Sequence, residues 1–244
     1  WHSFLRMQMK VAKKLNSVIV VSKSSKQDIH DDFGLKKEAM KVILNGIDTE
    51  AFFPDENIKK IPFRIVTSAS SDVPLKGLDY LLEAFSEVIK IFPDSTLQII
   101  GSSKQGGHTS RKINDLNIKE KVQFNNDLSF KEVRDLYCSA DVVVIPSLYE
   151  GFGFAIGEAM ACRVPVITTS GGAIPEVIED CGILVSPGNS KELEEAMIKL
   201  LPDEEKKSFF AEKGFNRIIE HLQWEKVAKL MTESYETEIN RTTN

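Results

Sequence analysis

The stretch DVVVIPSLYEGFGFAIGEAMACRVPVITT (141–169) contains two apolar runs, a glycine-containing loop and one short helical pattern. The runs DVVVIP (141–146) and VPVITT (164–169) are almost continuously apolar, which is typical of strands buried on both faces of a parallel sheet. The segment between them predicts a helix that begins near Gly153 or Phe154. A strand, a helix and a second strand in this order form a right-handed crossover unit.

The same alternation extends toward the N-terminus, where three more apolar runs predict strands: FRIVTS (63–68), TLQIIG (96–101) and KVQF (121–124). Between the first two, GLDYLLEAFSEVIKIF (77–92) repeats its apolar residues with the 3.6-residue period of a helix, and Pro93 ends it. Alternating strands and helices predict a doubly wound α/β domain with a parallel sheet over residues 63–220.

A second, incomplete pattern precedes this domain. VIVVS (18–22) and KVILN (41–45) predict two strands, with a helix between them that begins at Ser24 or Ser25. Two strands cannot form a covered sheet, so residues 1–50 are interpreted as the tail of a domain whose earlier part is absent. The remaining segments are interpreted as a linker (51–62) and as a terminal helix with its tail (221–244).

Composition excludes several classes of protein. The chain has 244 residues, of which 42% are hydrophobic and 27% charged, so it can bury a core and is neither disordered nor collagen-like. No apolar stretch approaches the ~18–20 residues that span a bilayer. The three widely spaced cysteines form no CxxC motif, which argues against a disulfide framework or a structural zinc site and favours a cytoplasmic location.

Charge is distributed unevenly along the chain. Residues 1–41 contain nine Lys and Arg against four Asp and Glu, although the net charge of the whole chain is −5. The acidic remainder argues against nucleic-acid binding. The basic segment is compatible with contact to the cytoplasmic face of a membrane, its apolar side consisting of Trp1, Phe4, Leu5 and Met9. A domain-packing helix with a solvated basic face is the alternative that we favour.

The loops at the carboxyl ends of the strands are expected to bind a ligand. Gly151 and Gly153 flank Phe152 just before the predicted helix, whose free N–H groups and dipole suit a diphosphate. Glu150 lies in the same loop and Glu158 about one helical turn later, and both carboxylates can accept hydrogen bonds from sugar or ribose hydroxyls. This pattern favours a nucleotide-sugar site over the alternative in which Glu150 only caps the helix and Glu158 is a solvated acid on its surface.

Two further features of these loops are open to two interpretations. Lys76 lies where a helix begins, and a cation there indicates a phosphate partner, unless it is simply a solvated lysine in a turn. GGAIPE (171–176) either closes on the ligand or is an ordinary glycine-rich turn with Glu176 as a first-turn acid. No DxD, HExxH or GxxxxGK[ST] motif occurs, so no metal is expected.

These residues closely resemble the retaining glycosyltransferases of family 4. The resemblance covers most of the chain, and its segments are NGID (45–48), LKG (75–77), residues 140–178 with the E-x7-E acids, and GILVSPGN (182–189). It implies a GT-B fold, in which two Rossmann-like domains face each other across a cleft. The second domain would bind a nucleotide-sugar donor, and the first, of which residues 1–50 would be the end, a glycan or lipid-linked acceptor.

The resemblance also implies roles for individual residues. Glu150 would contact the donor sugar and Glu158 the ribose, while backbone amides from Gly151 to Phe154 line the sugar and phosphates. Lys76 would neutralise the departing diphosphate, so that the sugar is transferred with retention through electrostatic stabilisation and without a cofactor.

The chain departs from the family at two points. The family commonly has Gly-Arg where this chain has Ser70 and Ser71, so one cationic clamp is missing or comes from elsewhere; we count Ser71 among the donor-binding residues. The family's catalytic histidine would lie before Trp1, and we therefore expect the chain alone to be inactive. The helix at 223–239, with Trp224, matches the family's terminal helix that crosses back to the first domain.

Two other functions stay open on the sequence alone. Gly151-x-Gly153-x-x-x-Gly157 partly fits an NAD(P)-dependent oxidoreductase, although no acid or arginine follows Thr169 to bind the ribose. The chain could also be a non-catalytic nucleotide-binding module, because half a cleft can hold a ligand without turnover.

Overall fold

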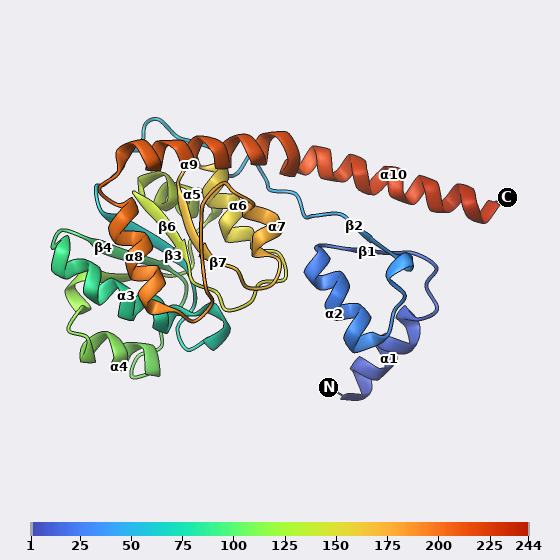
Figure 1. Ribbon diagram of the computed structural model, residues 1–244, viewed down its shortest axis with the longest axis horizontal. Coiled ribbons are helices and arrows are strands. Elements are labelled where there is room, and N and C mark those ends of the chain that lie inside the picture. Colours follow the sequence, from blue (N-terminus) through green and yellow to red (C-terminus); the bar gives the residue numbers. More distant parts are fainter. Residues whose placement is uncertain (1, 244) are drawn as a thin grey trace.

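The computed structural model describes residues 2–243, with the side chains of residues 7–240. Its main feature is a six-stranded, entirely parallel sheet in the order β5-β4-β3-β6-β7-β8 (Figure 1). The strands are β3 (Arg64–Ser68), β4 (Thr96–Ile100), β5 (Val122–Asn125), β6 (Val142–Ile145), β7 (Val166–Thr169) and β8 (Ile183–Val185). The first five were predicted. The sequence analysis did not predict β8, because three residues are too few to show a period.

Helices cover both faces of the sheet, and we call this part the sheet domain. One face holds α3 (Leu78–Ile91), α4 (His108–Asp115) and α8 (Ser190–Leu200); the other holds α5 (Phe130–Ser139), α6 (Phe154–Ala161) and α7 (Ile174–Ile178), with α9 (Glu204–Arg217) outside α6. Along β6, Val142 and Val144 pack into the core under α3 and α8, whereas Val143 and Ile145 pack into the core under α6 and α7. Each such fully buried side chain stabilises the fold by roughly 1.5–3 kcal/mol. The doubly wound α/β prediction is therefore confirmed.

Residues 2–45 form a small separate layer that we call the N-terminal unit, drawn in blue in Figure 1. It consists of α1 (His2–Ala12), β1 (Val18–Val20), α2 (Lys23–Phe33), a 3-10 turn (Lys37–Ala39) and β2 (Met40–Val42). The two predicted strands pair in parallel, with Val18 opposite Met40.

The predicted start of the helix between these strands was wrong. Helix α2 begins at Lys23, and its N-cap is Ser22 rather than Ser24 or Ser25. The reason is that Ser22 has an extended backbone and accepts a hydrogen bond from the Ser25 amide at 2.9 Å, as an N-cap residue requires.

Residues 51–62 contain neither helix nor strand, as expected of a connection. The chain just before them is nevertheless packed tightly, because Ile47 is 1% exposed and its amide donates to the Leu222 carbonyl at 2.7 Å. A Cβ atom on Gly157 would lie 2.4 Å from the Ile47 side chain, so this glycine lets the connection approach α6. The domain boundaries themselves stay a prediction.

A π-helical turn (Ile218–Leu222) leads into α10 (Trp224–Thr243), which runs from the sheet domain past the N-terminal unit (Figure 1). Residues of β2 and α10 line one cavity, so this helix does return to the N-terminal unit. None of the helices in the described chain is both long and apolar enough to traverse a bilayer. Of the predicted membrane-contact residues, Trp1, Phe4 and Leu5 lie outside the described side chains, so this contact stays a prediction.

Candidate functional site

Lys76 and Glu150 meet at the carboxyl ends of the central strands. Lys76 ends a 3-10 turn (Pro74–Lys76) after β3, and Glu150 lies in the loop after β6. The Lys76 ammonium is 2.8 Å from Glu150 Oε1, and the hydroxyl of Ser147 donates to the same oxygen at 2.7 Å. The sequence pattern predicted the first two residues as site residues but gave no signal for Ser147. Among the side chains of residues 7–240, those of Lys76 and Ser147 bond to Glu150 Oε1 and none bonds to Oε2, so Oε2 can accept from a ligand.

Close backbone packing fixes both loops. Gly77 has φ +64°, and a Cβ atom on it would lie 2.0 Å from the Pro146 carbonyl oxygen. The Leu148 amide donates to the Leu75 carbonyl at 2.8 Å, which joins the loop of Lys76 to that of Glu150. The site carboxylate therefore lies on a loop held by main-chain contacts rather than by its own side chain.

The GGAIPE segment supports the Glu150 loop from the other side. Gly172 has φ +65°, and its backbone approaches Glu150 so closely that a Cβ atom would lie 2.3 Å from the Glu150 carbonyl oxygen. The Ala173 amide donates to this same carbonyl at 2.8 Å. These glycines are thus needed to pack two loops together. Glu176 is a first-turn acid of α7, as one of the two interpretations held.

The start of α6 has the properties of an anion site. Gly153 is the N-cap in a left-handed conformation (φ +103°), and no side chain caps the helix. The Ile156 amide donates to the Gly153 carbonyl at 3.1 Å, and the amides of Phe154 and Ala155 before it remain available at the positive end of the helix dipole. Phe152 is buried and its ring packs against the exposed Phe154 with centroids 5.0 Å apart, which leaves only the backbone of Phe152 for a ligand.

Glu158 lies in the second turn of α6 and is half-buried. Burial raises the pKa of its carboxyl to about 7, and the nearby Tyr137 hydroxyl partly offsets this rise. Tyr137 is itself fully buried, and burial followed by the Glu158 charge raises its pKa. Its hydroxyl forms no hydrogen bond of normal geometry within the described residues. The sequence analysis missed Tyr137, because its position beside Glu158 depends on the packing of α5 against α6.

Ser71 lines a separate cavity. Its hydroxyl accepts from the Lys104 amide at 2.9 Å, and both residues line a cavity of about 570 Å³ beside β5 and α4. Lys104 is therefore a cation near the position where the expected arginine is missing.

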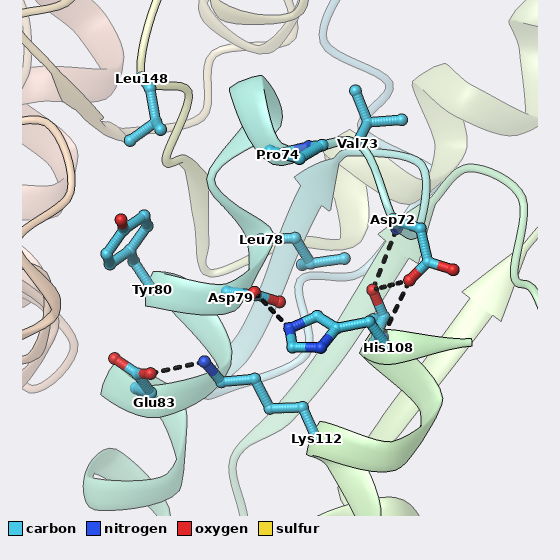
Figure 2. A pocket seen from close by; sticks show the side chains of 11 residues that line it. Asp72, Val73, Pro74, Leu78, Asp79, Tyr80, Glu83, His108, Lys112 and Leu148 are labelled. Atoms are coloured by element: carbon cyan, nitrogen blue, oxygen red, sulfur yellow. Dashed lines mark hydrogen bonds and ion pairs between the residues drawn. The ribbon is translucent and has the colours of Figure 1, made fainter. Parts of the chain in front are cut away.

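A second cavity, of about 280 Å³, lies behind the turn that carries Lys76 (Figure 2). Four of its charged side chains form ion pairs, His108 with Asp79 at 2.7 Å and Lys112 with Glu83 at 2.5 Å, and the Asp72 carboxylate accepts hydrogen bonds from Thr109. Figure 2 shows these pairs between α3 and α4. Neither Glu150 nor Glu158 lines either cavity, so their joint contact with one donor stays a prediction.

Comparison with known proteins places the chain in a family. Residues 48–217 match the family model described as glycosyl transferases group 1. The chain is 35% identical to the MMP alpha-(1->4)-mannosyltransferase of Mycolicibacterium hassiacum over 244 residues, which is 99% of the chain and 59% of that protein. The chain thus spans well under two thirds of the relative's length.

Two solved structures share the fold. The sucrose-phosphate synthase from Thermosynechococcus elongatus aligns with a TM-score of 0.85 at 24% identity, covering 99% of this chain and 63% of that one. The Anabaena HepE protein in complex with UDP-glucose aligns with a TM-score of 0.84 at 22% identity, covering 96% and 68%. These matches do not support the oxidoreductase alternative. Gly157, the third glycine of its motif, packs against Ile47. With its doubly wound sheet, its small N-terminal unit and this family match, the chain belongs to the group 1 glycosyl transferases, which have the GT-B fold.

Proposed function

We propose that this chain is the donor-binding part of a glycosyltransferase that moves a sugar, with retention, from a nucleoside-diphosphate sugar to a glycan or lipid-linked acceptor. The observation that carries the proposal is the position of Glu150. Its carboxylate is held by Lys76 and Ser147 at the carboxyl ends of the strands, directly before the uncapped N-terminus of α6. The Glu150 carboxylate can thus bind carbohydrate hydroxyls, and the amides at the start of α6, a few residues later, can bind a diphosphate.

The sugar-nucleotide donor can replace the ion pair between Lys76 and Glu150 with its own contacts to Lys76. The Lys76 side chain is 40% exposed, and an ion pair at such a site contributes no more than about 1 kcal/mol. A diphosphate can therefore recruit Lys76 and bind the free amides of α6 at low cost. As the bond to the sugar breaks, the ammonium group and the helix dipole stabilise the negative charge that accumulates on the leaving diphosphate.

The two carboxylates have separate tasks in this proposal. Glu150 accepts hydrogen bonds from the sugar hydroxyls, and Glu158 accepts them from the ribose. Lys104, which bonds to Ser71, supplies the second positive charge for the phosphates. No metal or other cofactor takes part in the proposed reaction, because the DxD motif of metal-dependent transferases is absent.

The relatives support a sugar nucleotide as the donor. The relative with 35% identity is a mannosyltransferase, and one structure with the same fold contains UDP-glucose. Since the chain spans only part of the mannosyltransferase's length, acceptor recognition and sugar transfer are proposed for the whole protein and donor binding for this chain.

Calorimetric titration tests this function. We expect the chain to bind UDP or GDP and the matching sugar nucleotide, and not NADH or NADPH. Glu150→Gln should weaken binding of the sugar nucleotide, while Lys90→Ala, which removes an exposed lysine of α3, should leave it unchanged. Binding of NADH, or of no nucleoside diphosphate at all, would overturn the proposal.

A further inference from the structure

The N-terminus of α2 is capped by a side chain of the sheet domain. Glu176, on α7, accepts hydrogen bonds from the amides of Lys23 at 2.7 Å and Ser24 at 2.9 Å. These are the first two residues of α2, whose N–H groups have no partner within the helix. The carboxylate also meets the positive end of the helix dipole. Glu176 therefore joins two parts of the chain that are more than 150 residues apart in sequence.

Helix α2 also touches the loop that carries the site carboxylate. The Tyr149 hydroxyl bonds to the Asp28 carboxylate on α2. The hydroxyls of Ser22 and Ser25, at the start of α2, each reach the Gly151 carbonyl at 3.4 Å. Tyr149 and Gly151 are the immediate neighbours of the site carboxylate on either side. The N-terminal unit thus holds this loop directly as well as through α7.

Helix α7, which carries the Glu176 carboxylate, is held by hydrogen bonds at both ends. Arg217, which is 9% exposed, donates to the carbonyls of Glu176 and Val177, both at 2.6 Å. At the other end of α7, the Ala173 amide is bonded to the Glu150 carbonyl at 2.8 Å. Helix α7 is therefore bonded to α9 at one end and to the Glu150 loop at the other. A shift of α7 caused by α2 thus changes the position of Glu150.

We propose that Glu176 is a positioning residue: by capping α2 it docks the N-terminal unit against residues 149–151 and holds Glu150 where it meets the donor sugar. The consequence for the donor rests on the proposed function, whereas the docking itself does not. Because coupling between two sites is reciprocal, donor binding also strengthens the docking of α2.

Hydrogen exchange of the nucleotide-free chain tests the docking. In Glu176→Ala we expect the amides of Lys23 and Ser24 to exchange about ten-fold faster or more, since these N–H groups lose their acceptor. Glu179→Gln is the matched control. It removes the same charge from the end of the same helix, but Glu179 pairs with Arg217 rather than with α2. Unchanged exchange at residues 23 and 24 in Glu176→Ala would overturn the proposal.

A second variant changes the donor side of these hydrogen bonds, on α2. Lys23→Pro removes one of the two donors at the first helical position, where proline is well tolerated. The preceding Ser22 is extended (φ −164°, ψ 162°), as a residue before proline should be. Lys23→Ala removes the side chain alone and serves as its control. We expect Lys23→Pro to accelerate exchange at Ser24, and to add little when combined with Glu176→Ala; full additivity would argue against the bond.

Titration then separates positioning from a general loss of structure. We expect Glu176→Ala to weaken binding of the intact sugar nucleotide about five- to ten-fold and of the nucleoside diphosphate less than two-fold. In the unsubstituted chain, the sugar nucleotide should slow exchange at residues 23 and 24. Equal losses for both ligands, or none, would overturn the positioning role. If the unsubstituted chain binds no nucleoside diphosphate, the proposed function fails, while the exchange experiment still decides the docking.

Discussion

The Nζ atom of Lys76 lies 2.8 Å from Oε1 of Glu150, and the pair joins the loop after β3 to the loop after β6. The Glu150 side chain is only 17% exposed, whereas that of Lys76 is 40% exposed. The cation is therefore the partner that can move when a ligand arrives. The carboxylate, which Ser147 also holds, is the fixed one.

This relationship predicts that the two substitutions affect different ligands. Lys76→Ala should weaken UDP or GDP binding by about 1–2 kcal/mol, because a charged hydrogen-bond donor to phosphate is lost. Glu150→Ala should weaken the intact sugar nucleotide but not the diphosphate alone, since it removes a competitor for Lys76. In a calorimetric double-mutant cycle the two changes should couple by about 0.5–3 kcal/mol. Strict additivity, or an equal loss of both ligands in Glu150→Ala, would contradict these roles.

A second prediction concerns the glycine that supports the site loop. Gly172→Ala should lower the free energy of unfolding by about 1–3 kcal/mol, because it combines a left-handed backbone with a backbone contact at 2.3 Å. Gly106→Ala is the control, since Gly106 has a similar φ of +69° with nothing within 4 Å of the added Cβ. Denaturant unfolding of both variants isolates the cost of the close approach. Equal losses would show that only the backbone angle matters.

Apolar patterns could predict five of the six strands of the sheet domain. Strands β3, β6 and β7 are buried on both faces, so each is a nearly continuous apolar run, and α3 shows a clear apolar stripe. Glu150 and Lys76 could also be found, because glycines and a helix start mark strand-end loops. The motif did not reveal that the two residues bond to each other.

The missed or misread features of the site depend on contacts that form only in the folded chain. Gly157 fitted a dinucleotide fingerprint by spacing, yet in the structure it packs against Ile47 of the connection. Glu176 looked like an ordinary first-turn acid, but its carboxylate caps a helix of the other unit. Ser147 is one polar residue among many in loops, and the conformation of its own loop brings its hydroxyl to Glu150, three residues later.

A third prediction concerns cysteine reactivity. A hydrogen bond from Cys162 is the main cause that lowers the pKa of the Cys138 thiol to about 7, whereas burial raises the pKa of Cys181. Alkylation by iodoacetamide, followed by mass spectrometry between pH 6 and 9, should therefore modify Cys138 at a lower pH than Cys181. Cys162→Ala should shift the profile of Cys138 to higher pH. A profile that does not move would exclude the thiol–thiol hydrogen bond.

The last prediction concerns Glu158, for which stability and binding should respond to pH in opposite directions. Burial raises its pKa from 4.5 to about 7 in the folded state. Between these values the folded chain keeps a proton that the unfolded chain has released. The stabilisation from this group is therefore complete below pH 4.5 and is lost as the pH rises through 7, by at most about 3 kcal/mol. Glu158→Gln is neutral throughout, so its stability relative to the unsubstituted chain should increase from pH 5 to 8 in denaturant unfolding.

Binding should follow the ionised form instead. A charged carboxylate accepts hydrogen bonds from ribose hydroxyls more strongly than a neutral one, so affinity for a nucleoside diphosphate should rise as the pH passes through 7. Glu158→Gln should flatten that rise, and Glu158→Ala should weaken binding by roughly 1–3 kcal/mol at pH 8. Tyr137→Phe removes the hydroxyl that favours the charged form, so it should move the midpoint of the rise to higher pH. If stability shows the expected slope and affinity does not, then Glu158 is a buried acid of α6 that does not contact the ribose.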